Sequence, residues 1–248
     1  MIKIGIVSGK GGVGKSTIAS SLSIALASRG FNVGLVDIDV TGPNIHDIMG
    51  DSELDISIND KFIPSESMGV KYVSVGEIAS EGLPILWNHK DVASAARQLM
   101  ERTEWGDIDF LIFDFPPGFG PETVEMLPLM DYILIVTAPS TLSRSKVERM
   151  IEAAREYEVP IVGVIVNMSY FKCPSCGALH RIFSENHDFK NYGIPVIAEI
   201  PLNPEIAKDK IIRDFPIDSF LEALMNPVIL KKKPKSFKRR LIEILLKR

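Results

Sequence analysis

The chain has 248 residues, of which 46% are hydrophobic and 24% charged, a composition that excludes extensive disorder. No basic and apolar leader precedes the first strand pattern, and the apolar runs are too short to cross a membrane. We therefore expect a cytoplasmic protein rather than a secreted or membrane-spanning one. The length fits one large α/β domain. The net charge of −4 is unevenly spread, because residues 231–248 hold nine basic residues and one acid.

Strand and helix patterns alternate along most of the chain. Short apolar runs predict strands at residues 2–7, 33–36, 70–75, 110–113, 132–136, 161–166 and 196–200. Apolar residues at helical spacing predict helices at residues 16–29, 91–102 and 142–157. Strands that are apolar throughout and alternate with helices are typical of a parallel sheet covered on both faces. We therefore predict an α/β fold with a largely parallel β-sheet flanked by helices on both faces.

The first predicted strand runs into a glycine-rich loop with the sequence GKGGVGKST. It matches the P-loop pattern GxxxxGKS/T between a strand and a helix, so a P-loop NTPase is predicted. Glycines let backbone N–H groups face phosphates, and the N-terminus of the next helix adds partial positive charge. Lys15 would neutralise the β- and γ-phosphates, and the Ser16 hydroxyl would hold Mg²⁺. The predicted nucleotide-binding residues of the loop are Gly9, Lys10, Gly11, Gly12, Val13, Gly14, Lys15, Ser16 and Thr17.

Polar residues follow three other predicted strands, where they would complete this site. Asp37 and Asp39 come after the second strand and, by strand alternation, point to the same side. Asp114 ends the fourth strand. Acids at strand ends can orient the water ligands of Mg²⁺, so Asp37 and Asp114 are predicted to support the metal. Asn167 follows the strand at 161–166, where its amide can offer a donor and an acceptor to adenine.

A second lysine inside the loop, Lys10, resembles the signature lysine of the deviant Walker ATPases, the class of MinD, ParA and the nitrogenase iron protein. The resemblance implies a homodimer that sandwiches ATP between its subunits. In that dimer Lys10 would reach the partner's nucleotide and act like an arginine finger. It also implies that Asp39 positions the attacking water. The catalytic residues would therefore be Lys10, Lys15 and Asp39.

The two cysteines of the chain, Cys173 and Cys176, stand in the string CPSCG. So short a spacing indicates metal ligands or a redox pair rather than a disulfide framework. Two thiolates fill half of a four-cysteine iron–sulfur site, and a two-fold dimer would supply them twice. Zinc is an alternative, bound with His180 and His187 or by four cysteines across a dimer. A dithiol redox pair is a third possibility.

Four segments together resemble the Mrp/ApbC-type iron–sulfur cluster carriers over about residues 1–215: DxDxxGPN, DFPPGFG, NMSYFKCPSCG and IPLNPEIA. The resemblance implies an ATPase that uses ATP and Mg²⁺, carries a 4Fe–4S cluster bridged across a homodimer, and transfers it to apo client proteins. The second segment departs from the family pattern at Phe119 and Pro121. The alternative is a MinD/ParA-like positioning ATPase on a membrane or DNA, with structural zinc at the cysteines.

The basic end of the chain predicts a separate segment. We expect an ATPase domain over residues 1–228, which includes the cysteine element at 173–177, and a basic amphipathic tail over residues 229–248. One helical stripe in this tail is formed by Phe237, Leu241, Ile244 and Leu245. Such a helix can pack on its own acidic domain, on a partner, or in the interface of an anionic membrane. Contact with nucleic acid is less favoured.

Overall fold

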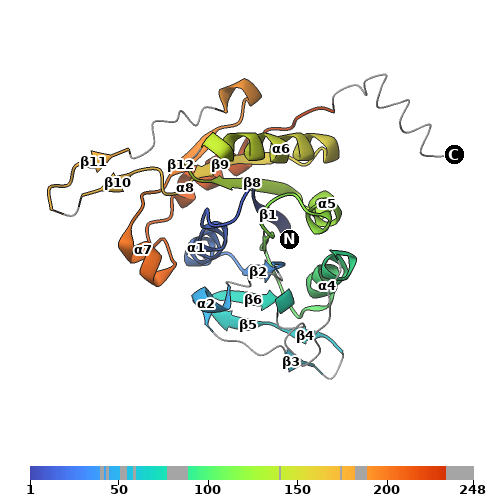
Figure 1. Cartoon of the computed structure of the whole chain (residues 1–248). Helices are drawn as coiled ribbons and strands as arrows, with labels where there is room; N and C mark the ends of the chain where they lie inside the picture. The colour runs from blue at the N-terminus through green and yellow to red at the C-terminus, as the bar shows by residue number, and fades with distance from the viewer. Residues whose placement is uncertain are drawn as a thin grey trace, which may run out of the picture.

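The computed structural model describes residues 1–39, 42, 45–50, 55–57, 60–76, 89–139, 141–173, 175–181 and 189–232. Within these residues the predicted architecture is confirmed, because a mostly parallel sheet carries helices on both faces (Figure 1). The strand order is β12-β9-β8-β1-β7-β2-β6-β5, and the one antiparallel pair among these described strands is β5–β6. The strands are β1 (Ile2–Ser8), β2 (Val33–Asp37), β5 (Ser65–Ser67), β6 (Val70–Ser74), β7 (Phe110–Asp114), β8 (Tyr132–Thr137), β9 (Ile161–Val166) and β12 (Val196–Glu199).

Two short antiparallel pairs lie outside this sheet. One joins β3 (Asp55–Ile56) to β4 (Phe62–Ile63). The other joins β10 (Phe171–Lys172) to β11 (Leu179–His180), and it forms a hairpin that projects from the body of the domain (Figure 1). The predicted cysteine element is the tip of this second pair.

The central strands are buried because helices cover both of their faces. Every residue of β7 and of β9 is buried. One face of the sheet packs on α4 (His89–Arg102), α5 (Pro121–Met126) and α6 (Thr141–Tyr157). The other face packs on α1 (Lys15–Ser28), α2 (His46–Met49), α7 (Pro204–Asp209) and α8 (Ile217–Met225) (Figure 1). Removal of this apolar surface from water, at about 25 cal/mol per Å², is the main force that holds the layers together.

Helix α1 shows how the sequence pattern sets a helix and its ends. Ile18, Leu22 and Leu26 recur at helical spacing and are fully buried against the sheet. The helix ends before Gly30, whose φ of 88° lies in the left-handed region that glycine adopts readily. The helix is therefore fixed with its N-terminus at the loop that follows β1.

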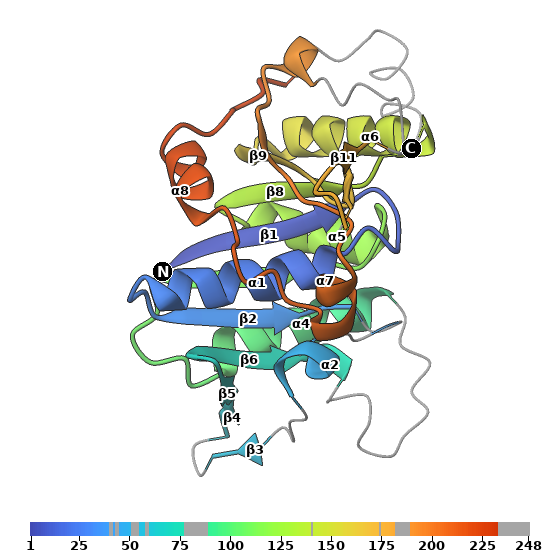
Figure 2. The same cartoon turned by 90° about the vertical axis from the view of Figure 1, so that its left-hand side faces the viewer.

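The strands that carry predicted site residues all end at the same edge of the sheet, at the right of Figure 2. β1 leads into the phosphate loop, β2 ends at Asp37, β7 ends at Asp114, and Asn167 follows β9. The register places Asp114 opposite Asp37 and opposite Ile6 of β1. Ligands of open α/β sheets bind outside the carboxyl ends of the strands, so this edge is the expected site.

Residues 233–248, most of the predicted tail, lie outside the described residues, so the amphipathic helix stays a prediction. The segment that leads to them is anchored on the domain. Val228 and Ile161 exchange two backbone hydrogen bonds of 2.8 and 2.9 Å. Lys232 Nζ lies 3.3 Å from Glu158 Oε2, just beyond α6. None of the helices in the described segments is long and apolar enough to cross a membrane.

Candidate nucleotide-binding site

The loop between β1 and α1 borders a cavity of about 490 Å³. Gly12 and Gly14 have φ values of 75° and 81°, which only glycine adopts at little cost. Gly14 is also the N-cap of α1, so the free N–H groups of the first helical turn lie at the cavity. Of the predicted loop residues, all but Gly9 line the cavity. Gly9 instead packs on α6, where a Cβ atom would lie 2.5 Å from Lys146 Cβ.

Buried charges gather beneath the loop. The Lys15 ammonium forms a salt bridge with Asp114, and both side chains are buried. Asp37 is also fully buried, on the strand beside Asp114. Two fully buried carboxylates thus share one ammonium, whose side chain also lines the cavity. A buried excess of negative charge is costly unless a cation or a proton compensates it.

The pKa values reflect this excess. Burial raises the pKa of Asp37 to about 8, and the neighbouring Asp114 carboxylate adds to the rise. Burial also raises the pKa of Asp114, whereas the Lys15 ammonium lowers it. The Ser16 hydroxyl also lowers the pKa of the Asp114 carboxyl.

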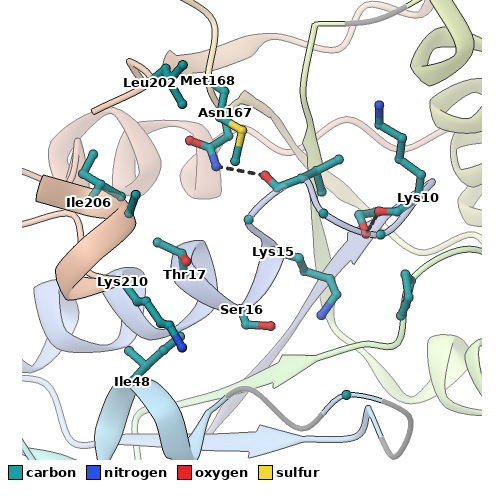
Figure 3. Close-up of a pocket in the computed structure, with 18 of the residues that line it drawn as sticks. Lys10, Lys15, Ser16, Thr17, Ile48, Asn167, Met168, Leu202, Ile206 and Lys210 are labelled. Atoms are coloured by element: carbon teal, nitrogen blue, oxygen red, sulfur yellow. Dashed lines mark hydrogen bonds between the residues drawn. The ribbon is translucent and has the colours of Figure 1, made fainter. Parts of the chain in front are cut away.

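These residues fit a magnesium ion. Asp114 Oδ2 is buried and has no hydrogen-bond partner among the described residues. A divalent cation with its water ligands would compensate the excess charge and satisfy this oxygen. Ser16, which follows Lys15 in the chain, also lines the cavity (Figure 3).

Asp37 and Asp39 have different positions in the site. β2 ends at Asp37, and the backbone N–H of Asp39 donates to Asp37 Oδ1 over 2.9 Å. The N–H of Ile45 donates to Asp37 Oδ2 over 3.4 Å. Asp37 therefore lies beneath the cavity and holds the segment that follows it, while Asp39 lines the cavity. After Asp39, residues 40, 41, 43 and 44 lie outside the described residues.

Lys10 lines the cavity but extends away from Lys15 (Figure 3). Its backbone is fixed by Ser8, whose hydroxyl donates to the Lys10 carbonyl over 3.1 Å. The two lysine side chains of the loop therefore point in different directions: Lys15 is buried beneath the loop, and Lys10 extends away from it.

The loop after Asp114 contacts the phosphate loop directly. The N–H of Gly118 donates to the Ser8 carbonyl over 2.9 Å, and Pro117 lines the cavity. The two departures from the family pattern lie at the end of this loop. Phe119 is 45% exposed, and Pro121 takes the first turn of α5, where proline fits without loss of a hydrogen bond.

Asn167 joins the end of β9 to the phosphate loop. Its side chain is almost completely buried and lines the cavity, and Nδ2 donates to the Val13 carbonyl over 2.9 Å (Figure 3). A Cβ atom on Gly14 would lie 2.3 Å from this same Nδ2. The predicted contact with adenine therefore rests on Oδ1 and the second N–H of the amide, because one N–H is engaged by the loop.

The far wall of the cavity was not predicted from the sequence. Its residues are Ile48, Met168, Pro201, Leu202, Asn203, Ile206, Ala207 and Lys210 (Figure 3). Lys210 Nζ lies 2.7 Å from Asp47 Oδ2 and so links α7 to α2. A largely apolar wall with a few polar groups is typical of a pocket for a base. One local signal was the N-cap of α7, because Asn203 Oδ1 accepts the N–H of Glu205 and Pro204 follows it. The segment IPLNPEIA, noted for its family resemblance, covers much of this wall but was not assigned to the site.

The cysteines lie at the tip of the β10–β11 hairpin, away from the cavity floor. Cys173 is half-buried and Cys176 exposed, and neither forms a disulfide. The tip is a tight turn in which the N–H of Gly177 donates to the Cys173 carbonyl over 2.8 Å. Backbone N–H groups of Cys176 and Ser175 lower the pKa of the Cys173 thiol. A lowered pKa favours the thiolate, which is the form that binds metals.

The described part of one chain does not complete a metal site at this tip. Among the described residues, no three His, Cys, Asp or Glu side chains cluster so that they could hold a metal. His180, one of the alternative zinc ligands, is exposed on β11, and His187 lies outside the described residues. Two thiols on an exposed turn are therefore available for ligands that come from elsewhere.

Comparison with known proteins agrees with this geometry. The family model described as "ParA: NUBPL iron-transfer P-loop NTPase" matches residues 1–214. An iron-sulfur cluster carrier protein of Saccharolobus solfataricus is 38% identical over 215 residues, which cover 83% of this chain and 73% of that protein. The carrier protein of Aquifex aeolicus is 36% identical over 83% of this chain, but the match spans only 58% of that longer protein.

Solved structures give the same fold. A nucleotide-binding protein of Archaeoglobus fulgidus in complex with ADP has a TM-score of 0.74 at 28% identity, over 88% of this chain and 87% of the other. The cell division ATPase MinD of Pyrococcus furiosus has a TM-score of 0.66 at 20% identity, over 91% and 98% of the two chains. The second likeness concerns the fold alone.

Proposed function

Because the chain belongs to the ParA family of NUBPL iron-transfer P-loop NTPases, we propose that it is an ATP-dependent carrier of an iron–sulfur cluster. The resemblance to the iron–sulfur cluster carriers is thereby confirmed at the level of the family. One observation carries the proposal further: the same chain holds a phosphate-loop cavity and, at the tip of a separate hairpin, one half-buried and one exposed thiol that make half of a cluster site.

In the proposed site, ATP lies with its phosphates on the glycine loop and its base against the far wall. Lys15 neutralises the β- and γ-phosphates once it exchanges its contact with Asp114 for the nucleotide. Ser16, Asp37 and Asp114 hold and orient the hydrated Mg²⁺, which supplies charge compensation for phosphoryl transfer. The unpartnered oxygen of Asp114 supports this role.

Hydrolysis then needs a positioned water and a cation on the outer side of the γ-phosphate. Asp39 lines the cavity and is the proposed residue that positions the water. Lys10 extends away from Lys15, as a lysine must if it serves the nucleotide of a second subunit (Figure 3). A homodimer that closes over two nucleotides is therefore the proposed active state.

The cluster is the cargo of this dimer. Cys173 and Cys176 of both subunits provide the four thiolates that a 4Fe–4S cluster takes, so the cluster bridges the two-fold axis. Apo iron–sulfur proteins in the cytoplasm are the proposed recipients. Zinc bound by the same four thiolates is the alternative, and it fits a MinD/ParA-like positioning ATPase.

The decisive experiment is anaerobic reconstitution with iron and sulfide. We expect a brown protein with about four iron atoms per two chains, in keeping with a four-cysteine cluster. Cys173→Ser and Cys176→Ser should each lose the iron but keep ATP binding, because the phosphate loop is built elsewhere. Ser175→Ala, between the two cysteines, is the matched control and should load normally. A colourless protein that retains zinc would favour the positioning ATPase, and a monomer with a full cluster would exclude the bridged site.

The basic tail is proposed to contact either the protein itself, a partner or an anionic membrane surface. Its first basic residues, Lys231 and Lys232, are described, and Lys232 already pairs with Glu158 of the same chain. Sedimentation with anionic vesicles, for the full chain and for a chain that lacks residues 233–248, separates these options. Vesicle binding that needs the tail and weakens with salt would identify the membrane as its partner.

A further inference from the structure

The first strand of the cysteine hairpin is joined to the far wall of the nucleotide cavity. After Asn167 and Met168, which line the cavity, the chain runs beside the segment that follows β12. The N–H of Ser169 donates to the Ile200 carbonyl over 2.8 Å, and the N–H of Leu202 donates to the Tyr170 carbonyl over 2.7 Å. Leu202, which also lines the cavity, thus pairs with the strand that leads to Cys173.

The second strand of the hairpin has a separate attachment. Arg181 follows β11, and its Nη2 lies 2.8 Å from Glu199 Oε2 at the end of β12. The buried hydroxyl of Ser169 donates to this same oxygen over 3.0 Å. Glu199 therefore ties both ends of the hairpin to β12, directly before the residues that wall the cavity.

Few other contacts of the described residues hold the hairpin. Its outer side chains are exposed, among them Leu179, Cys176 and His180. The direction in which the two thiols point is thus set by the main-chain pairing at Leu202 and by the Arg181–Glu199 ion pair. A ligand that contacts Leu202 would act on the first of these two contacts and not directly on the ion pair.

We propose that Arg181 and Glu199 are positioning residues that couple the nucleotide cavity to the cysteine pair. The inference rests on the proposed function for its biological role, but the proposed coupling does not require a bound cluster. Nucleotide contacts at Met168 and Leu202 shift the first strand of the hairpin. The ion pair holds the second strand, so the turn with Cys173 and Cys176 changes its exposure. The nucleotide state then sets how open the thiols are to cargo.

The test measures thiol reactivity in metal-free, full-length protein. Alkylation rates of Cys173 and Cys176 are compared without nucleotide, with ADP and Mg²⁺, and with a non-hydrolysable ATP analogue and Mg²⁺. We expect nucleotide to change the rate by about fivefold or more, the lower end of ordinary coupling between two sites. In Arg181→Ala and Glu199→Gln the change in alkylation rate caused by nucleotide should shrink to less than about twofold. The expected reduction is modest in free energy because the lost ion pair is exposed.

Two further variants distinguish positioning from general structural damage. The charge exchange Arg181→Glu with Glu199→Arg should restore the nucleotide dependence. Arg29→Ala removes an exposed ion pair with Asp218 between the end of α1 and α8, away from the hairpin, and should leave the dependence intact. Nucleotide affinity should stay within about twofold in all of them, since none removes a phosphate or metal contact. The proposal is overturned if nucleotide does not change the alkylation rate of the wild-type thiols, if Arg181→Ala keeps the full effect, or if Arg29→Ala loses it equally.

Discussion

The contact between Gly14 and Asn167 gives the sharpest test of how the cavity is built. Gly14 has a φ of 81°, and a Cβ atom added there would lie 2.3 Å from Asn167 Nδ2. In Gly14→Ala the left-handed backbone alone costs roughly 1–2 kcal/mol. Asn167 must also move away, which breaks its bond to the Val13 carbonyl and leaves buried polar groups unpaired, at a further cost of roughly 1–3 kcal/mol.

Gly30 offers a matched control at the other end of the same helix. Its φ is 88°, and nothing lies within 4 Å of an added Cβ atom. Gly30→Ala should therefore lose only the backbone contribution, about 1–2 kcal/mol of unfolding free energy. Gly14→Ala should lose roughly 2–5 kcal/mol, the sum of both effects. Chemical denaturation without nucleotide measures the difference between the two variants.

Nucleotide affinity and a double variant complete the test. ADP titration should show at least about a tenfold loss of affinity in Gly14→Ala and none in Gly30→Ala, because only the first displaces a cavity residue. Asn167→Ala should relieve the clash, so the double variant with Gly14→Ala should be more stable than the sum of the single losses predicts. Equal losses of stability in the two glycine variants, with unchanged ADP affinity, would refute the idea that Asn167 and Gly14 constrain each other.

Three more predictions concern the charged residues of the site. Lys10→Ala should keep ATP binding but slow phosphate release by about 10²-fold or more, if this lysine stabilises the transition state of the partner subunit; normal turnover would contradict that role. Asp39→Asn should accumulate an ATP-bound dimer on size-exclusion chromatography, whereas a monomer with bound ATP would contradict it. Metal-free protein should lose unfolding free energy as the pH rises from about 4 toward 8, because the folded state keeps a proton on Asp37 that the unfolded chain releases. Asp37→Asn should flatten this dependence in denaturation curves, and an unchanged slope would exclude Asp37 as its source.

The sequence predicted the strongly periodic parts of this fold well. All seven expected strands and all three expected helices are present, with ends that differ by at most two residues. Buried parallel strands are apolar throughout, so they are visible without knowledge of their neighbours. The phosphate loop was equally clear, because its glycine and lysine spacing is dictated by contact with phosphates.

The elements that depend on tertiary contacts were not predictable in the same way. β5 is a three-residue edge strand with only half-buried or exposed side chains, so its pattern carries no period. Helix α7 has no fully buried residue, and its only local signal is the Asn203 cap. The far wall of the cavity depends on such segments. The bond from Asn167 to the phosphate loop joins residues 154 positions apart, which no local pattern encodes.

The antiparallel pairing of Val228 with Ile161 fixes where the C-terminal segment leaves the sheet. Ile161 begins β9, and Asn167 follows its other end, so the strand separates the root of the tail from the nucleotide by about 20 Å, at 3.3 Å per residue. The described C-terminal segment is therefore attached at the end of β9 opposite the nucleotide cavity. A chain attached at this end would keep its nucleotide cavity and its two cysteines at the opposite end of the strand. Nucleotide could then exchange at the cavity while this attachment stays in place.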